Sequence, residues 1–257
     1  DQTLILLDGI PVYNPSHAFG FFSTFSPDAI KDITLYKGAY PAPYGGNLGA
    51  VLEVSNREGN RQRFAGRGAI SLISAQLALE GPVGSGSWMM SGRRTYLDPL
   101  LAAIRSAGTE VPGYYFYDFN AKINQSLGPS DALLFSAYLG QDDLNFDLEE
   151  DTFFNIRWGN RTLTGQWTHI LSPELFARFT AAYSRYESNT SATIFDTPIS
   201  FNNGISDLTL KGNVDYFASS NHNVSSGVAL TQYDFNFGQS FNSQDQIDLD
   251  ETPELLA

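Results

Sequence analysis

The chain has 257 residues and a formal net charge of −13, with 14% aromatic and 17% charged residues and no cysteine. The negative charge argues against a nucleic-acid partner, because binding a phosphate backbone requires clustered Lys and Arg. The lack of cysteine excludes disulfides, thiolate metal sites and a cysteine nucleophile, and it fits an oxidising compartment. No stretch reaches the ~18 apolar residues of a membrane helix, whereas the strands of a membrane barrel need only alternate.

The first stretch of the chain, Leu4 to Arg57, is rich in Gly and Pro and differs in character from the remaining residues. It opens directly on a strand-like run with no signal-peptide pattern, so we expect a mature chain or a part of one. We expect a hairpin across Asp8-Gly9, a loop at Asn14-Pro15-Ser16, and a short helix that begins at Ser26-Pro27-Asp28. Two further strands are predicted at Ile33 to Tyr36 and Ala50 to Val54.

A glycine-rich segment, Tyr44 to Gly49, lies between the last two of these strands. It has neither the Gly-Lys-Ser/Thr ending of a phosphate loop nor GxGxxG spacing, so nucleotide binding is a poor interpretation. Glycines placed in this way allow positive φ or a close approach of two backbones.

The rest of the chain reads as nine alternating strands joined by turns. The predicted strands are Arg67 to Ile73, Ala75 to Val83, Trp88 to Tyr96, Tyr115 to Leu127, Ala132 to Leu144, Phe154 to Leu171, Leu175 to Glu187, Ile205 to Phe217 and Asn223 to Phe237. Tight turns come after every second strand, near residues 84–87, 128–131, 172–174 and 218–222. The connections at the opposite rim are expected to be mostly long loops, as in outer-membrane barrels.

Within the predicted strands, apolar and polar residues alternate strictly. Tyr117, Phe119, Ala121 and Ile123 alternate with Asp118, Asn120, Lys122 and Asn124, and residues 207–216 repeat the pattern. Charges on one face suit a polar barrel lumen better than the dry core of a sandwich. Periodicity alone leaves a large soluble antiparallel sheet as an equal alternative.

Several spaced motifs in fixed order carry a family resemblance: LLDGIPV, then NPSHAFGFFSTFSPDAIKD, then ITLYKG and PAPYGGNLGAVLEV. In this order they resemble the second half of the plug domain of TonB-dependent outer-membrane receptors, in a Bacteroidetes-like subtype. The resemblance implies a fold dominated by β structure. A partial α+β plug domain (residues 1–60) precedes a transmembrane antiparallel β-barrel (residues 61–257) with about nine of an expected twenty-two strands.

The same resemblance implies a transporter in the outer membrane of a Gram-negative bacterium, and not an enzyme. Its expected partners are a scarce nutrient (an iron chelate, cobalamin or an oligosaccharide), the TonB complex on the periplasmic side, outer-membrane lipids and an optional outer lipoprotein. The alternative function is that of a surface or soluble β-sheet protein that recognises glycans. A β-scaffold enzyme lacks support because the sequence contains neither GxSxG nor HExxH.

Two sets of site residues come from the resemblance. The loop after the hairpin would meet the ligand, which assigns Tyr13, Asn14, Ser16, His17 and Phe19 to substrate contact; alternatively, the Phe residues pack the plug and Asn-Pro-Ser only turns the chain. Lys37 and Arg57 would latch the plug to carboxylates of the barrel, although Lys37 stands where related plugs usually carry Arg and cannot form the bidentate fork. The pair Arg93-Arg94 could face the lumen or the outer rim.

An acidic run from Asp142 to Asp151 begins with D-x-N-x-D spacing, as calcium loops do. Leu148 occupies the position at which such a loop requires Gly, so the EF-hand interpretation fails. We expect a solvated outer loop with weak Ca²⁺ or cation binding as the alternative, and we interpret the run that contains Asp245, Asp248, Asp250 and Glu251 in the same way. No other cofactor is expected.

Overall fold

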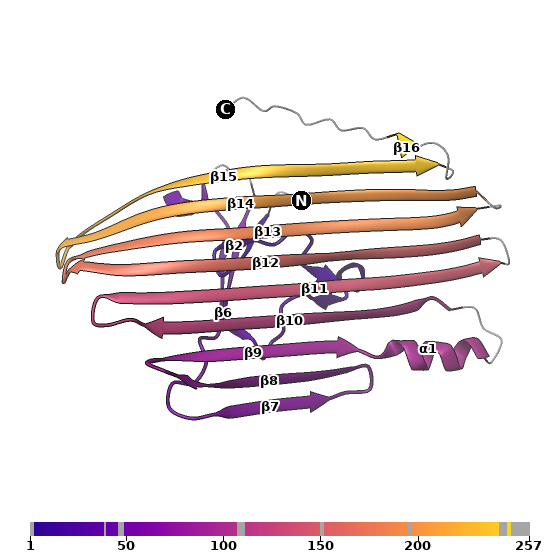
Figure 1. The fold of residues 1–257 in the computed structure, drawn as a ribbon, viewed down its shortest axis with the longest axis horizontal. Coiled ribbons are helices and arrows are strands. Elements are labelled where there is room, and N and C mark those ends of the chain that lie inside the picture. Colours follow the sequence, from indigo (N-terminus) through magenta and orange to yellow (C-terminus); the bar gives the residue numbers. More distant parts are fainter. Residues whose placement is uncertain are drawn as a thin grey trace.

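The structure, a computed structural model, describes residues 3–38, 40–45, 49–106, 111–149, 152–194, 197–241 and 246–247. It consists of a large single-layer sheet with a small N-terminal unit lying against one face (Figure 1). We call residues 3–56 the plug unit and the large sheet the wall. The boundary that we predicted after residue 60 lies between the last strand of the plug unit, which ends at Asn56, and the first wall strand, which begins at Ala65.

The plug unit is built around a mixed four-stranded sheet in the order β2-β1-β6-β5. Strand β1 is parallel to β6 and antiparallel to β2, and β5 is antiparallel to β6. A short hairpin, β3 with β4, stands apart from this sheet. The elements are β1 (Leu4–Leu7), β2 (Ile10–Pro11), β3 (Ser16–His17), η1 (Ala18–Gly20), β4 (Phe22–Ser23), β5 (Ile30–Tyr36), η2 (Ala42–Tyr44) and β6 (Val51–Asn56).

The predicted hairpin across Asp8-Gly9 is confirmed. Leu7 pairs with Ile10, which leaves a two-residue turn. Both turn residues have positive φ, 50° at Asp8 and 80° at Gly9. A type I′ turn requires this geometry at both positions, and Asp-Gly is among the pairs that adopt it most readily.

The predicted helix at Ser26-Pro27-Asp28 is wrong. The backbone N–H of Ala29 donates to the carbonyl of Ser26 (3.0 Å), which closes a single turn. Strand β5 already begins at Ile30, where the chain pairs with Asn56 of β6. The capping residues thus favour a first turn, but pairing with β6 takes the following residues into the sheet.

The wall is a ten-stranded sheet in which consecutive strands are neighbours, from β7 to β16. All nine predicted strands are confirmed, and the tight turns lie where we expected them. The strands are β7 (Ala65–Ile70), β8 (Ser74–Val83), β9 (Gly86–Thr95), β10 (Gly113–Ser126), β11 (Asp131–Glu149), β12 (Thr152–Ser172), β13 (Leu175–Ile194), β14 (Thr197–Ser219), β15 (His222–Phe241) and the short β16 (Gln246–Ile247).

The prediction of mostly long loops at the second rim holds for the connection between β9 and β10 but is wrong for those after β11 and β13, because β11, β13 and β14 extend well beyond their predicted ends. Strand β13 continues past Glu187 to Ile194, and β14 begins at Thr197 instead of Ile205. These segments are rich in Asn, Ser and Thr, which weakened the apolar signal. Their ladder remains complete from Ser188↔Asn203 to Ile194↔Thr197, because backbone pairing does not need apolar side chains.

Helix α1 (Leu97–Ser106) comes after β9 and was not predicted. Leu97 and Leu101 pack against a buried cluster that contains Tyr114 and Phe116. The i, i+4 spacing of these leucines is helical, so the signal was present in the sequence. In the described part of the chain no helix is long and apolar enough to cross a membrane.

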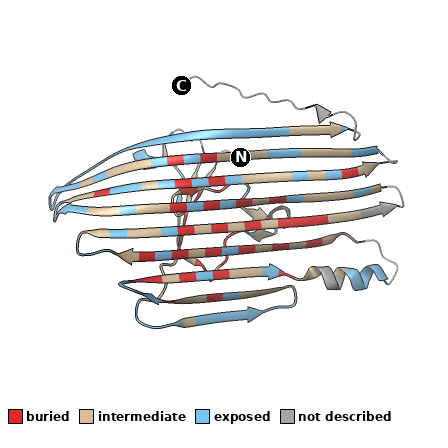
Figure 2. Ribbon diagram, viewed as in Figure 1, coloured by how far each residue is buried: buried red, intermediate tan, exposed pale blue. Residues whose placement is uncertain are grey.

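The predicted alternation of the wall strands is confirmed. Asp118, Lys122 and their polar neighbours on β10 are buried toward the plug unit, whereas Phe119 and Ile123 are 40% and 38% exposed on the opposite face. Buried residues gather in the middle of the strands, where the plug unit covers them (Figure 2). Where the plug covers it, the wall therefore has a polar inner face, and residues such as Phe119 and Ile123 give the opposite face apolar character.

Candidate functional site

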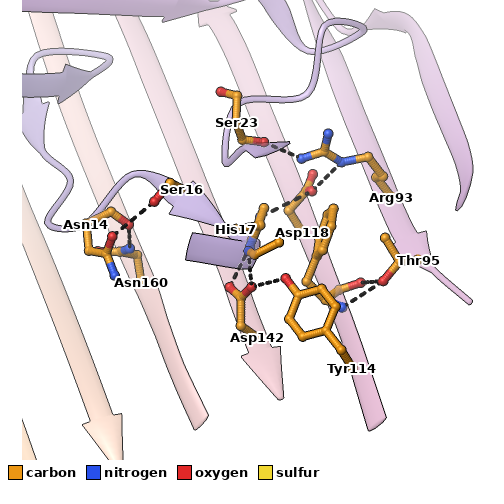
Figure 3. A network of polar contacts seen from close by, with 12 residues as sticks. Asn14, Ser16, His17, Ser23, Arg93, Thr95, Tyr114, Asp118, Asp142 and Asn160 are labelled. Atoms are coloured by element: carbon orange, nitrogen blue, oxygen red, sulfur yellow. Dashed lines mark hydrogen bonds and ion pairs between the residues drawn. The ribbon is translucent and has the colours of Figure 1, made fainter. Parts of the chain in front are cut away.

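The plug unit meets the wall through buried polar side chains, of which the first group surrounds His17 (Figure 3). His17 lies on β3 and is 1% exposed. Its ring stacks on Phe116 of β10, with centroids 4.1 Å apart and an interplanar angle of 8°. Its Nδ1 lies 2.6 Å from Oδ2 of Asp142 on β11, and because a carboxylate only accepts, Nδ1–H donates.

Two wall carboxylates share the surroundings of this imidazole. Asp142 also accepts from the backbone N–H of Ala18 (3.1 Å) and from the hydroxyl of Tyr114. Asp118 has its Oδ2 3.7 Å from Nε2 of His17 and accepts from Nε of Arg93 (2.7 Å). We call His17, Asp142, Asp118, Arg93 and Tyr114 the histidine cluster.

Arg93 connects the histidine cluster to a second point of the plug unit. Its guanidinium donates to the carbonyl of Ser23 on β4 (2.6 Å) and lies 5.0 Å above the ring of Phe116. The next residue, Arg94, alternates to the outer face, where it lies over Tyr115. The open question about this pair is thus resolved: Arg93 faces the plug and Arg94 faces outward.

The histidine cluster is not fully satisfied. Within the described residues, Nε2 of His17 and Oδ1 of Asp118 are buried without a hydrogen-bond partner. Leaving a buried polar atom unpaired costs about 1–3 kcal/mol. The cluster therefore attaches the plug through ion pairs and hydrogen bonds. The two unpaired atoms cost folding free energy, which is unusual for a purely structural core.

The approach of His17 to the wall depends on a glycine. A Cβ added at Gly140 of β11 would lie 2.0 Å from the hydroxyl oxygen of Tyr138 and 3.5 Å from Cε1 of His17. Tyr138 in turn packs into the plug core beside Leu7 and Val54. Gly140 thus leaves space for both the tyrosine side chain and the imidazole.

A second buried group surrounds Asp8 at the tip of the hairpin. Its Oδ1 lies 2.8 Å from Nζ of Lys122, and its Oδ2 accepts from the hydroxyl of Ser136 (2.7 Å). Asn56 donates to the same carboxylate from its backbone and its side chain, and Lys122 also donates to the carbonyl of Asn56 (3.1 Å). We call Asp8, Lys122, Ser136 and Asn56 the aspartate cluster.

Wall strands β13 and β14 hold the same hairpin from the other side. Lys211 donates to the carbonyl of Gly9 (2.9 Å), and Ser184 donates to the carbonyl of Pro11 (2.7 Å). Together with the aspartate cluster, these contacts bind the DG hairpin to wall strands that are far apart in the sequence.

The predicted ligand-contact residues lie at the junction of plug and wall. The hydroxyl of Tyr13 donates to Asp207 of β14 (2.6 Å), and burial together with this bond raises the pKa of Tyr13 above its ordinary range. Asn14 is exposed and donates to the hydroxyl of Tyr186 (3.3 Å), while Ser16 donates to the side-chain oxygen of Asn14 (3.2 Å). Of these three, Asn14 presents the most accessible side chain.

His17 and Phe19 belong to the same predicted ligand-contact set. The burial of His17 between the wall carboxylates leaves almost none of its surface open to a ligand in this conformation. The backbone of Phe19 lies in η1, and its side chain is outside the described residues. Ligand contact by either residue stays a prediction.

Of the two predicted latch residues, one pairs with a wall carboxylate and the other does not. Arg57 lies 3.3 Å from Glu80 of β8, so a plug-side arginine does pair with a wall carboxylate. Lys37 is exposed and forms no ion pair with any residue that the structure describes. The geometry of Arg57 agrees with a latch, although its function as one is untested.

The prediction of a solvated acidic loop is wrong for the first residues of the run. Asp142 and Asp143 lie inside β11 and are 1% and 3% exposed, with Asp143 paired to Arg157 (2.9 Å). No group of three or more His, Asp or Glu residues suited to a metal ion occurs among the described residues. Glu150 and Asp151, like Asp245, Asp248, Asp250 and Glu251, lie outside the described part.

Sequence reasoning did not identify the partners of three central residues of this interface: Asp8, Asp118 and Asp142. Asp8 was interpreted only as a turn former, and Asp142 as part of a loop. For Asp118 the sequence did carry a signal. Asp118, Asn120 and Lys122 alternate with apolar residues and so share one face of β10, and a buried charge requires a partner. What the sequence could not supply was the pairing of these residues with the plug.

Comparisons with known proteins agree with this architecture. The family model described as the TonB-dependent receptor plug domain matches residues 1–51. No curated protein sequence matches the chain. The structure resembles that of FpvA from Pseudomonas aeruginosa, described in complex with a heterologous pyoverdine and iron. The TM-score is 0.63 at 12% identity, over 95% of this chain and 38% of FpvA.

Two further receptors share the fold. BauA, the ferric preacinetobactin receptor from Acinetobacter baumannii, matches with a TM-score of 0.64 at 11% identity, over 93% of this chain and 40% of BauA. The siderophore receptor PirA from Pseudomonas aeruginosa matches with a TM-score of 0.50 at 16% identity, over 93% of this chain and 50% of PirA. The chain thus spans half or less of the length of these receptors, and the likeness concerns the fold.

The plug match and the fold lead to the same assignment. Residues 1–51 match a receptor plug in sequence, and the described residues share the fold of the receptor structures. The chain therefore combines a segment that matches a TonB-dependent receptor plug with a wall that shares the fold of solved receptors.

Proposed function

We propose that this chain serves in a TonB-dependent transporter in the outer membrane of a Gram-negative bacterium. The transporter binds a scarce nutrient on its outer side and passes it to the periplasm with energy delivered by the TonB complex. The observation that carries the proposal is the plug unit itself, which lies against the polar face of a sheet whose opposite face is apolar. A stopper inside a membrane barrel needs this arrangement.

The chemistry of the interface supports a plug that can move. The histidine and aspartate clusters bind the plug through hydrogen bonds and ion pairs, and water can replace these contacts when the plug shifts. An apolar interface would instead expose apolar surface to water each time the plug moved, at a free-energy cost of about 25 cal/mol per Å² exposed. Polar attachment therefore lowers the work that TonB must supply.

For the ligand, an iron chelate is the first candidate, with cobalamin or an oligosaccharide as alternatives. The support comes from two proteins of the same fold: FpvA is described in complex with a pyoverdine and iron, and BauA is the ferric preacinetobactin receptor. On this chain, the exposed amide of Asn14 and the largely exposed ring of Phe21 are the plug groups most open to a ligand. An amide and an aromatic face can bind a chelate or a sugar equally well.

Fractionation and uptake test this proposal. The protein should be recovered with outer membranes, should require detergent for extraction, and should migrate differently on gels before and after heating. Uptake of the ferric ligand should cease in a strain that lacks TonB. Recovery in the soluble fraction would instead favour the alternative function, a soluble β-sheet protein that binds glycans.

A further inference from the structure

The outer face of the wall changes from apolar to polar between two adjacent rows of residues. One row consists of the cross-strand partners Leu163, Tyr183 and Leu208 on β12, β13 and β14, all exposed. The next row toward the long strand ends consists of Arg161, Arg185, Ser206 and Asp234. On the side of the tight turns, the apolar character continues through rows that contain Phe135, Trp167, Phe179, Leu210 and Leu230.

A polar hollow lies immediately beyond this boundary on the same face. Its volume is about 320 Å³. Its lining includes the side chains of Arg185, Glu187, Asn189, Asn202, Asp234 and Asn236. Gly204 contributes no side chain, and a Cβ added there would meet Asn236 Cβ at 3.7 Å and Glu187 Cγ at 4.0 Å. The hollow therefore offers amides, carboxylates and one guanidinium around a floor left open by glycine.

Arg185, which lines the hollow, lies directly opposite a second arginine, Arg161, on the neighbouring strand. Arg161 and Arg185 are direct cross-strand partners and point to the same face. Like charges in this position repel one another and destabilise the pair of strands. Arg185 is bonded to Glu187, whereas Arg161 forms no ion pair with a carboxylate in the described part of the chain. An anionic group between the two guanidinium groups would remove the repulsion.

We propose that this hollow and the Arg161–Arg185 pair bind the phosphorylated saccharide headgroup of a lipid in the outer leaflet. The inference rests on the proposed membrane location. Two guanidinium groups bind a phosphate through charge-assisted, bidentate hydrogen bonds. The Asn amides donate to and accept from sugar hydroxyls, and the carboxylates of Glu187 and Asp234 accept from them.

The position of the hollow identifies a lipid as the source of this headgroup, instead of free phosphate or a soluble sugar. The acyl chains of a lipid held at the Arg161 row would lie along the apolar rows that begin at Leu163 and Tyr183. Free phosphate or a soluble glycan would gain nothing from these rows. The geometry thus combines a polar headgroup site with an apolar surface for the tail.

Binding of the purified protein to a diphosphorylated glucosamine-disaccharide lipid tests the inference, with the lipid presented in phosphatidylcholine vesicles. The charge-removing double substitution Arg161→Gln/Arg185→Gln should weaken binding by roughly ten- to a hundredfold. The matched control is Arg178→Gln, which removes an arginine from the inner face of the same strand β13 and should bind as the unaltered protein does. Gly204→Leu should also weaken binding, because it fills the hollow without changing the charge.

Three outcomes would overturn the inference: equal binding by the double variant, equal binding of phosphatidylcholine vesicles without the phosphorylated lipid, or full competition by inorganic phosphate. Heat-dependent gel migration verifies that each variant is folded. A protein extracted without detergent would contradict the proposed membrane location itself. A protein that stays in the membrane but shows no effect of the substitutions would contradict only the lipid site.

Discussion

Nδ1 of His17 in the plug lies 2.6 Å from Oδ2 of Asp142 in the wall, although 125 positions separate the two residues in the sequence. Both side chains are almost fully buried, and the imidazole also faces Asp118. The family resemblance assigns His17 to ligand contact, whereas in the structure its side chain is buried against the wall. In the described conformation, His17 attaches the plug to the barrel wall.

Replacing His17 by Phe should loosen the plug. The aromatic ring can still stack on Phe116, but Asp142 loses a buried hydrogen-bond donor, which costs about 1–3 kcal/mol. Faster hydrogen exchange of the Ala18 amide, which donates to Asp142, would report this loss. His222→Phe, at an exposed turn, is the matched control. Unchanged exchange at Ala18 would remove His17 from the attachment.

The aspartate cluster should behave as one unit. Removing either Asp8 or Lys122 leaves the other charge buried, so Asp8→Asn and Lys122→Met should each be strongly destabilising. The double variant should be less unstable than the sum of the two single variants, with a coupling of about 0.5–3 kcal/mol in a double-mutant cycle. Strict additivity in denaturant titrations would show that the pair contributes nothing as a pair.

Gly140→Ala should push Tyr138 or His17 out of position, because the new methyl group would lie 2.0 Å from the hydroxyl of Tyr138. Tyr138→Phe removes that hydroxyl and should restore part of the lost stability. Gly165→Ala on β12 is a suitable control, since its Cβ would meet only Phe135 atoms, the nearest at 3.4 Å. Thermal unfolding of the four proteins measures the effect, and equal midpoints for both glycine variants would contradict it.

The bond between Tyr13 and Asp207 should persist into alkaline solution. The pKa of Tyr13 is raised by its burial and by its hydrogen bond to Asp207, whereas an unfolded tyrosine titrates at about 10. Folding stability from this residue is therefore complete below about pH 10 and declines as the pH rises beyond it. Tyrosinate absorbance at about pH 11 should be the same for the folded protein and for Tyr13→Phe. A lower absorbance in the variant would show that Tyr13 titrates normally.

Much of the fold could be predicted from the sequence, because the relevant signals are local. The Asp8-Gly9 turn is explained by two residues that tolerate positive φ, and the nine wall strands by alternation and turn residues. The errors also have local causes. Capping residues at Ser26 indicated a helix that strand pairing prevented, and the polar extensions of β13 and β14 were interpreted as loops.

The candidate site could be predicted only in part. The sequence indicated that Asp118 and Lys122 face a polar interior, and it indicated Arg57 as a plug residue that pairs with a carboxylate. It could not indicate that His17 contacts Asp142 or that Asp8 contacts Lys122, because both pairs depend on how two separate units dock. Docking is a long-range property that neither periodicity nor turn chemistry encodes.

Chemical labelling of the wall beneath the plug tests the central claim most directly. Ser184 of β13 is 0% exposed and donates to Pro11 of the plug. Since the chain contains no cysteine, Ser184→Cys provides a single reactive thiol, with the exposed Ser225→Cys as control. In cells with ligand and active TonB, a maleimide should label position 184, whereas without TonB it should label only position 225. Labelling of position 184 at the same rate with and without TonB would contradict a plug that moves during transport.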